Sequence, residues 1–422
     1  MKKTYIQIRY RIRTSPSNYR LLHQISGANR HLWNAALEMI DKQYQTTKKS
    51  DFSFFSLCRW YVIYKNQTAP WLKNYPRSIT RVILKDVSDA YRAFVTKKRG
   101  RPRFKSKHRN RPSIPIEMND RFKTKEDGVY FRMKKGHDIK LIHYHKQLNR
   151  YQNPIPKCAR IIQSTTGKWY LTVCYQVDAM EQKEDGLGIG IDRNVRQVAD
   201  HQGQLYHLTN TDSIQKRIQY WQRKKARQKK GSRRSYKTQL TINRHHEKIK
   251  NIRKNDLIHI ANQITTKSSS IVMEDLRTKG MTASARGTID QPGKNVKSKS
   301  GLNRAILGTG WYQLEQHLSA RGMVHKINPA YTSQTCSCCG YVSKHNRLSQ
   351  SQFVCQQCGH TENADVNAAR NIWASGKGTM LKNGHGVFVR PIISSHGYEG
   401  LNTLKCQSDW NNHSINNGYE SI

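Results

Sequence analysis

Residues 336–370 read CSCCGYVSKHNRLSQSQFVCQQCGHTENADVNAAR and form the most informative stretch of the chain. They contain two Cys-x-x-Cys pairs separated by fifteen residues, and a glycine follows the second cysteine of each pair. Two such pairs supply the four thiolates of a tetrahedral zinc site, and glycine permits the tight turn that each pair requires. The sequence therefore predicts a structural Zn²⁺ ion bound by Cys336, Cys339, Cys355 and Cys358.

A fifth cysteine, Cys338, lies inside the first pair and leaves one alternative open, because a Cys-x-Cys-Cys run can use either neighbour as a ligand. The spacing favours Cys336 and Cys339 as the ligands and leaves Cys338 as a free thiol. The chain has nine cysteines, and the other four are scattered, at Cys58, Cys158, Cys174 and Cys406. This pattern does not predict disulfides and fits a reducing cytoplasm.

The chain is strongly basic. Its 422 residues include 74 Lys and Arg against 28 Asp and Glu, which gives a formal net charge of +46. Such a charge repels itself unless a polyanion neutralises it, and the basic residues are interleaved with aromatic and aliphatic ones along most of the chain. There is no apolar run long enough to span a bilayer, and the first residues lack the apolar core of a signal peptide. We therefore expect a cytoplasmic protein that binds RNA or DNA and no membrane.

The first half of the chain predicts a β-barrel with an inserted helical block. Residues 4–13 alternate apolar with polar side chains and predict a strand, whereas 17–45, with Ser17 as N-cap, and 78–95 show helical periodicity. The segment 97–114 is rich in Pro, Gly and Arg and predicts a loop that follows phosphates or a solvated linker. Short alternating runs between 129 and 177 predict a small antiparallel barrel that the N-terminal strand closes.

The second half predicts a ribonuclease H-like α/β fold, because strands and helices alternate after a hairpin. A polar linker at 178–186 precedes this half, and weak periodicity after 377 predicts a loosely ordered tail. The expected elements are strands at 187–192, 268–276 and 323–331, a hairpin at 195–208 turning at Gly203, antiparallel helices within 214–264 broken at 231–232, a mobile loop at 277–303, and helices at 306–322 and 364–374.

Three carboxylates stand out by their position in a chain that is poor in acids. Asp192 and Glu274 each end an apolar strand, and Asp365 opens a helix. Each acid alone would be an ordinary strand-end or helix-capping residue. Together they could hold divalent cations, because Mg²⁺ relieves the repulsion between converging carboxylates. We predict a magnesium site at these three residues and expect Asp275 to face the opposite side of its strand.

The motifs that contain these residues resemble those of the TnpB nucleases of insertion sequences, which are relatives of the miniature type V CRISPR effectors. The motifs are GIGID (188–192), IVMED (271–275), NPAYTSQTCSCCG (328–340), CQQCG (355–359) and NADVNAARNI (363–372). The resemblance implies a multidomain α/β protein. Its implied parts are a wedge β-barrel (1–14 and 97–180), a helical recognition domain (15–96), a RuvC-like nuclease domain (186–330 and 362–376) and a zinc-binding target-strand loading element (331–361), followed by the tail (377–422).

The resemblance also implies a function. Proteins of this family bind a guide RNA made from the transposon end, recognise a short motif beside the target and cut both strands of DNA. It implies that Asp192, Glu274 and Asp365 are catalytic Mg²⁺ ligands in a prokaryotic protein that associates with the nucleoid when bound to DNA. The basic segments 97–114 and 216–254 are the expected walls of a channel for the guide–target duplex.

The sequence departs from the family pattern after the first acid, where Arg193-Asn194 replaces the Leu-Gly of many relatives. Asn tolerates the left-handed backbone that the turn needs. Arg193 is expected to point to solvent or serve a structural role, with a grip on phosphate as the alternative. The competing functions are an RNA-guided DNA-binding protein or transposition regulator without cleavage, a strand-joining transposase and a basic scaffold of the ribosomal kind. The intact acids favour the nuclease.

Overall fold

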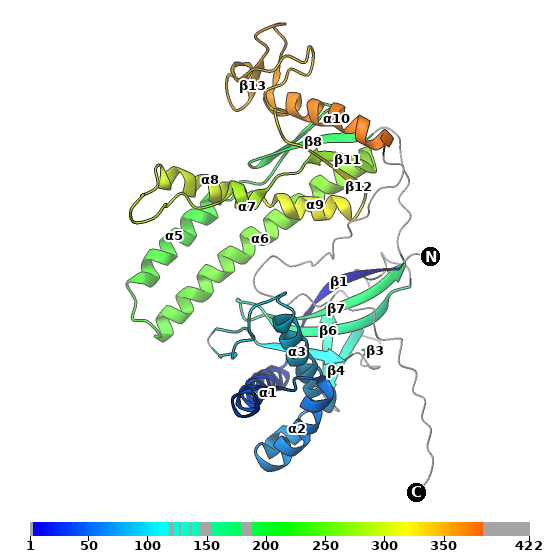
Figure 1. Cartoon of the computed structure of the whole chain (residues 1–422), viewed down its shortest axis with the longest axis vertical. Coiled ribbons are helices and arrows are strands. Elements are labelled where there is room, and N and C mark those ends of the chain that lie inside the picture. Colours follow the sequence, from blue (N-terminus) through cyan, green and yellow to red (C-terminus); the bar gives the residue numbers. More distant parts are fainter. Residues whose placement is uncertain are drawn as a thin grey trace. The chain divides into compact units, whose positions relative to one another are not determined.

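The computed structural model describes residues 3–107, 109–117, 122–125, 128–134, 137–142, 148, 153–178 and 188–382. The chain divides between Ala179 and Met180 into two compact units, and each is considered by itself (Figure 1). In the part of the chain that the structure describes, no helix is both long enough and apolar enough to cross a membrane.

The first unit contains a seven-stranded antiparallel sheet with the strand order β2-β6-β7-β1-β5-β4-β3. The N-terminal strand pairs with β7 on one side and β5 on the other, which confirms that it joins the strands predicted at 129–177. The two edge strands, β2 and β3, do not pair with each other among the described residues, so closure into a barrel stays a prediction. The strands are β1 (Lys3–Ile12), β2 (Ser113–Glu117), β3 (Phe122–Lys125), β4 (Gly128–Lys134), β5 (His137–Ile142), β6 (Ile155–Gln163) and β7 (Trp169–Asp178).

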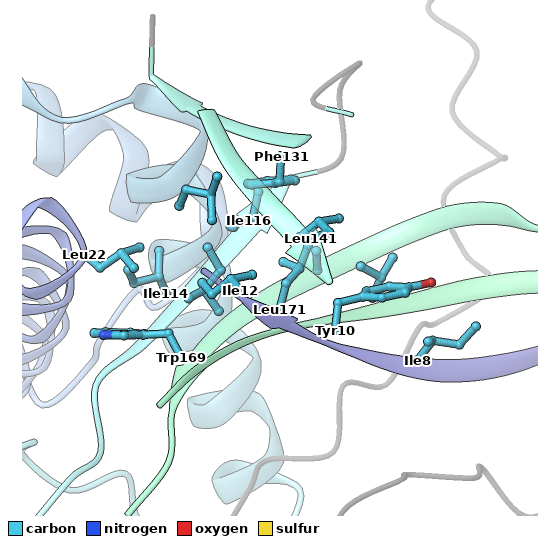
Figure 2. Close-up of a cluster of buried hydrophobic side chains, with 14 of the residues drawn as sticks. Ile8, Tyr10, Ile12, Leu22, Ile114, Ile116, Phe131, Leu141, Trp169 and Leu171 are labelled. Carbon is cyan, nitrogen blue, oxygen red and sulfur yellow. The ribbon is translucent and has the colours of Figure 1, made fainter. Parts of the chain in front are cut away.

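The core of this sheet follows from the alternation of β1. Ile8, Tyr10 and Ile12 lie on one face and are at most 7% exposed (Figure 2). The Tyr10 hydroxyl donates to the Tyr175 hydroxyl on the neighbouring strand, at 3.1 Å, so the buried phenol keeps a polar partner.

Three helices and one 3₁₀ turn follow β1, in the region where the sequence predicts a helical block. They are α1 (Pro16–Thr47), α2 (Phe54–Gln67), η1 (Pro70–Asn74) and α3 (Arg77–Val95). The N-cap of α1 is Ser15 rather than Ser17, because its hydroxyl accepts the Asn18 N–H at 3.2 Å and Pro16 fits the first helical position. The sequence did not predict α2.

The basic loop after α3 is held against α1. The carbonyl of Arg103 accepts the Trp33 indole N–H at 3.1 Å, and the Asn34 side chain bonds both backbone groups of Lys105. The Lys105 ammonium lies 3.4 Å from the centroid of the Trp33 ring, and burial lowers its pKa to about 8. The loop is therefore ordered over this stretch rather than a solvated linker.

The second unit contains a five-stranded mixed sheet with the order β10-β9-β8-β11-β12. Strands β8, β11 and β12 are parallel, while β9 and β10 are antiparallel to their neighbours. The strands are β8 (Ile189–Asn194), β9 (Gln197–Asp200), β10 (Leu205–His207), β11 (Ser270–Glu274) and β12 (Met323–Ile327). This order confirms the predicted hairpin, the two predicted buried strands and the third predicted strand, which ends at Ile327.

Helices cover this sheet and extend from it (Figure 1). They are α5 (Asp212–Ala226), α6 (Arg233–Lys267), α7 (Thr278–Met281), α8 (Val296–Thr309), α9 (Trp311–Ser319) and α10 (Ala364–Lys382). A small cysteine-bearing element between β12 and α10 holds η2 (Lys344–Asn346), β13 (Gln352–Val354) and β14 (Thr361–Asn363). The break between α5 and α6 is where the sequence predicts it, with Gly231 at a φ of 81° and Ser232 as the N-cap of α6.

Three expectations for this unit were wrong. The stretch 277–303 is not a structureless loop, since it contains α7 and the start of α8. The helix expected at 306–322 is two helices separated by Gly310, whose φ of 81° ends α8. The last helix runs to Lys382, past the predicted start of the tail at 377, and the rest of that tail lies outside the described residues.

Close packing of α10 on β8 explains one glycine of the GIGID motif. A Cβ atom at Gly190 would lie 2.4 Å from the Cβ of Trp373, which is a clash with the helix. The Trp373 indole N–H donates to the carbonyl of Gly188 at 3.1 Å. This contact fixes α10, and with it Asp365, across the end of β8.

Candidate active site and cysteine cluster

Two of the predicted acids lie side by side at the ends of parallel strands. Ile191 of β8 is paired with Met273 of β11, so the next residues, Asp192 and Glu274, are neighbours. Burial, followed by the nearby carboxylates of Glu274 and Asp365, raises the pKa of Asp192 to about 7. Glu274 and Asp365 therefore act electrostatically on Asp192, although they lie up to 173 positions from it in the sequence.

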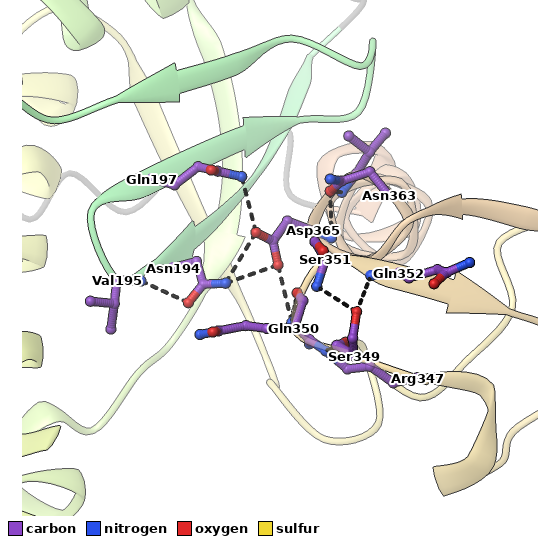
Figure 3. A network of polar contacts seen from close by, with 11 residues as sticks. Asn194, Val195, Gln197, Arg347, Ser349, Gln350, Ser351, Gln352, Asn363 and Asp365 are labelled. Carbon is purple, nitrogen blue, oxygen red and sulfur yellow. Dashed lines mark hydrogen bonds and ion pairs between the residues drawn. The ribbon is translucent and has the colours of Figure 1, made fainter.

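Asp365 lies in the first turn of α10, is only 4% exposed and is held by three side chains (Figure 3). The Asn194 amide donates to both carboxylate oxygens, at 2.9 and 3.0 Å, and the Gln197 amide donates at 3.1 Å. Arg347 contributes an ion pair at 3.1 Å. The capping role belongs to Asn363, whose Oδ1 accepts the N–H groups of Asp365 and Val366, so the Asp365 carboxylate is not a helix cap.

Glu274 is oriented by residues from two other segments. Its Oε1 accepts the hydroxyl of Thr332, and its backbone carbonyl accepts the guanidinium of Arg193. Burial raises the pKa of Glu274, while the Thr332 hydrogen bond acts against that rise. Thr332 follows β12 directly before the first cysteine pair, so this segment reaches the acid site.

Arg193 does not point to solvent and does not present its side chain to a phosphate. Its side chain is 3% exposed and pairs with Glu315 of α9 at 3.5 Å. Burial lowers its pKa, and Glu315 opposes that change. Of the roles expected for Arg193, its burial and its ion pair therefore support a structural one.

Asp275 faces away from the other acids, as predicted from strand alternation. Its backbone N–H donates to the Ile327 carbonyl at 2.8 Å, and its side chain lies 3.3 Å from the Lys326 ammonium. More than half of that side chain is exposed.

Four of the five clustered cysteines come together. The sulfurs of Cys336, Cys339, Cys355 and Cys358 lie within 4.8 Å of one another, whereas Cys338 is exposed and outside the group. Gly340 and Gly359 have φ angles of 79° and 70° and close the two turns, as predicted from their places in the sequence. The arrangement suits a tetrahedral zinc ion, because four thiolates in one such cluster are its usual structural ligands.

The backbone around the sulfur of Cys355 favours its thiolate, whereas the pKa values of Cys336, Cys339 and Cys358 are raised. Burial acts to raise the pKa of Cys355, but the N–H groups of Cys358 and Gln357 face its sulfur and bring the pKa down to about 6. A bound metal requires the deprotonated form, so this thiol is prepared for coordination.

Asparagines of α10 attach the cysteine element to the helix that carries Asp365. Asn367 bonds the N–H of Ser337 at 2.9 Å and the carbonyl of Thr335 at 2.8 Å. Asn371, one turn further along, donates to the carbonyls of Thr332 and Thr335. The spacing of four residues puts both amides on one helix face, so the cysteine element and the acids form a single structure.

The chemistry of this site follows from its donor set. A buried carboxylate whose pKa is raised by two neighbouring carboxylates is a poor arrangement in the absence of a cation, and carboxylate oxygens are the ligands that Mg²⁺ prefers. The sequence pattern marks the three acids as candidates but does not mark Arg347, Gln197 or Thr332. Each of these contacts an acid from another segment, and no local pattern marks them.

The helical hairpin α5–α6 is the most basic part of this unit. Between Lys216 and Lys254 it carries sixteen Lys or Arg, opposed in that stretch by Glu247. Tyr220 and Tyr236 are 58% and 69% exposed on the same hairpin. Exposed aromatic rings among cations are typical of surfaces that bind nucleic acids.

Three protein-family models match the chain. One described as "Cas12f1-like, TNB domain" matches residues 311–372, which hold the cysteine element and Asp365. One described as "Probable transposase" matches 172–285, which hold Asp192 and Glu274. A third, described as a helix-turn-helix domain, matches 1–49, which form a strand and one long helix here.

Named relatives match over different lengths. "Putative RNA-guided DNA endonuclease InsQ" of Escherichia coli K12 is 33% identical over 387 residues, covering 88% of this chain and 93% of the relative. A "Putative RNA-guided DNA endonuclease" of Streptomyces pristinaespiralis is 23% identical and covers 69% of this chain and 70% of its own length. "CRISPR-associated endodeoxyribonuclease Cas12f1" of Sulfoacidibacillus thermotolerans is 43% identical over 75 residues, 17% of this chain and 18% of that protein.

Proposed function

Because this chain belongs to the TnpB family, we propose that it is an RNA-guided, Mg²⁺-dependent endonuclease that cuts double-stranded DNA beside a short target-adjacent motif. The observation that carries the proposal is the convergence of Asp192, Glu274 and Asp365 at one end of the sheet, where the first of them has a pKa raised to about 7. Carboxylates in this arrangement serve to bind divalent cations.

Each acid has a defined part in this proposal. Asp192 and Glu274 present their carboxylates from adjacent parallel strands, and Asp365 presents its own from α10. Asn194, Gln197 and Arg347 keep Asp365 in place, and Thr332 orients Glu274. Mg²⁺ bound by the three acids would activate a water molecule and stabilise the departing 3′ oxygen of the phosphodiester.

The proposed fold of the second unit is RuvC-like. Its sheet order, with a hairpin followed by two parallel strands and a helix across β8, supports this assignment. We propose that 186–330 and 362–376 form the nuclease domain, that 331–361 form the zinc-binding target-strand loading element, that 1–14 and 97–180 form the wedge domain, and that 15–96 form the recognition domain.

The proposed partners are a guide RNA made from the transposon end and double-stranded target DNA. Sixteen cations on α5–α6 that are almost unopposed would repel one another in the absence of a polyanion. A heteroduplex bound there would be recognised by its backbone charge and A-form shape, while base pairing would choose the target. The protein purified at moderate salt should therefore carry RNA.

The test uses the purified protein with its co-purified RNA and a matching target. Asp192→Ala, Glu274→Gln and Asp365→Ala should each abolish Mg²⁺-dependent cleavage while RNA and target binding stay within about twofold. The matched control is Asp275→Asn, which alters the neighbouring acid that faces Lys326 and should cut normally. Undiminished cutting by any of the three variants would refute the assignment, and binding without cutting by the unmodified protein would favour the guided DNA-binding alternative.

A further inference from the structure

Tyr331 has a backbone conformation that a tyrosine rarely adopts. Its φ is 63°, in the left-handed region where a side chain crowds the backbone and glycine or asparagine is preferred. The conformation is held by a turn, because the Tyr331 carbonyl accepts the N–H groups of Gln334 and Thr335 and also the Thr335 hydroxyl. The turn itself would form equally well with glycine at this position.

Hydrophobic packing of the Tyr331 ring does not offset the free-energy cost of this backbone conformation. The tyrosine is 63% exposed, and it belongs to none of the hydrophobic clusters among the described residues. A large ring that is both strained and exposed does not stabilise the fold, so its presence requires another reason.

The residue that follows Tyr331 contacts one of the acids, and this suggests a reason. The next residue, Thr332, donates its hydroxyl to Glu274 and to the Pro329 carbonyl. The Thr332 carbonyl in turn accepts the Asn371 amide of α10 at 2.9 Å. The exposed ring is therefore carried by a segment that is fixed to both the acid site and the last helix, and it belongs to the residue directly before the one that contacts Glu274.

We propose that the Tyr331 ring stacks on a base of an unpaired DNA strand next to the phosphate that the acids cleave. This inference rests on the proposed function and names a side chain that would position the DNA strand. A base within a duplex has neighbours on both faces, so an exposed ring can stack only on a base that is unpaired or at a strand end. Every base has such a face, so the contact places the strand without selecting its sequence.

The first experiment separates stacking from a hydrogen bond of the phenol to phosphate. In the guide-loaded protein with Mg²⁺, Tyr331→Ala should raise the KM for cleavage by about 5- to 100-fold and leave kcat within about twofold. Tyr331→Phe keeps the ring and should cleave like the unmodified protein. Tyr341→Ala, at a 41% exposed tyrosine on the same cysteine element, is the matched control and should not change KM. A Phe variant as impaired as the Ala variant would overturn the stacking.

The second experiment locates the contact directly. Asp192→Ala protein with its RNA is mixed with a DNA strand complementary to the guide that carries 5-iododeoxyuridine in an unpaired extension, and is then irradiated. Peptide mapping should find the crosslink at Tyr331, and pairing the extension with a complementary strand should reduce it about fivefold or more. Equal crosslinking in the paired form, or none at Tyr331 while unmodified protein prepared in the same way cuts DNA, would overturn the inference. Cleavage by Asp192→Ala would instead contradict the proposed function.

The third experiment tests that the ring does not serve the fold. Tyr331→Gly relieves the backbone at this position and should raise the melting temperature of the protein by about 1–3 °C, while it should raise KM as Tyr331→Ala does. A fall in melting temperature would show that the ring contributes to stability, and would contradict the argument.

Discussion

The guanidinium of Arg347 lies 3.1 Å from Oδ1 of Asp365, so the loop between the two cysteine pairs supplies a cation to the carboxylate at the start of α10. The same guanidinium donates to the Gln350 carbonyl at 2.9 Å, which holds it within its own loop. Burial and the other two acids raise the pKa of Asp192, and the charge of Arg347 acts against that rise. The cysteine element thus adjusts the charge of the acid site.

Arg347→Ala should therefore reduce cleavage by about 10- to 100-fold, because residues that orient metal ligands have effects of this size. The Mg²⁺ concentration for half-maximal rate should rise as well, since Asp365 loses one of the groups that fix its carboxylate. Arg347→Lys keeps the positive charge but lacks the planar guanidinium, so its cleavage rate should lie between those of the unmodified protein and Arg347→Ala. Arg370→Ala, which breaks the pair between this half-exposed arginine of α10 and Glu362 of β14, is the control. Equal rates for the Ala variants of Arg347 and Arg370 would show that the contact has no catalytic consequence.

The cysteine cluster gives a prediction about metal content. Cys339→Ser should lose one zinc per chain by elemental analysis and should also lose cleavage at saturating Mg²⁺, because Arg347 and Thr332 flank the first cysteine pair and contact the acids. Cys338→Ser is the matched control, since its thiol is exposed and outside the cluster. Zinc retained by Cys339→Ser and lost by Cys338→Ser would mean that the ion uses the other cysteine.

The Arg193–Glu315 pair gives a prediction about stability. Arg193→Leu should lower the free energy of unfolding by about 2–3 kcal/mol, because it removes one partner of a buried ion pair and leaves the Glu274 carbonyl without its donor. The loss is limited because Glu315 keeps Lys326 at 2.9 Å. Arg196→Ala breaks the exposed pair with Asp212 and should cost about 1 kcal/mol or less. Denaturant unfolding of both variants checks the difference, and similar losses would contradict it.

Much of the second unit was predictable because its signals are local. Asp192 and Glu274 end runs of apolar residues, the cysteine pairs have the spacing of a zinc site, and Gly231-Ser232 marks the helix break. The cluster of four cysteines confirms the assignment of Cys339 over Cys338 as its member. These features depend on residues that are close in sequence.

The parts that sequence analysis missed depend on tertiary contacts. Arg347 is one basic residue in a basic chain, and only the approach of the loop to α10 distinguishes it. The charge of Arg193 suggested contact with solvent or phosphate as well as a structural role, whereas its burial and its ion pair with Glu315 of α9 favour the structural role. The first part of α8 was predicted to be a loop because Lys, Ser and Gly dominate it, yet the helix begins at Val296. Propensity is overridden in each case by packing that the local sequence does not record.

A half-buried histidine, His317, makes the stability of the second unit depend on pH. Burial lowers the pKa of His317 in α9 to about 4, and the cations Arg321 and Lys254 act in the same direction. In the unfolded chain this pKa returns to about 6.5, so the unfolded state binds the proton more readily. The stabilising effect of a neutral His317 is complete above pH 6.5 and is lost as the pH falls from about 6.5 towards 4.

His317→Gln should therefore flatten the pH dependence of stability. Between pH 7.5 and pH 5 the unmodified protein should lose about 1–2 kcal/mol more of its unfolding free energy than the variant, because glutamine takes up no proton. His345→Gln is the control, since His345 is exposed on the cysteine element and its replacement should leave the pH profile unchanged. Denaturant unfolding at several pH values gives both profiles. If the profiles of His317→Gln and the unmodified protein stay parallel, His317 takes up its proton equally in both states, and the charged surroundings supplied by Lys254 and Arg321 do not act on its ring.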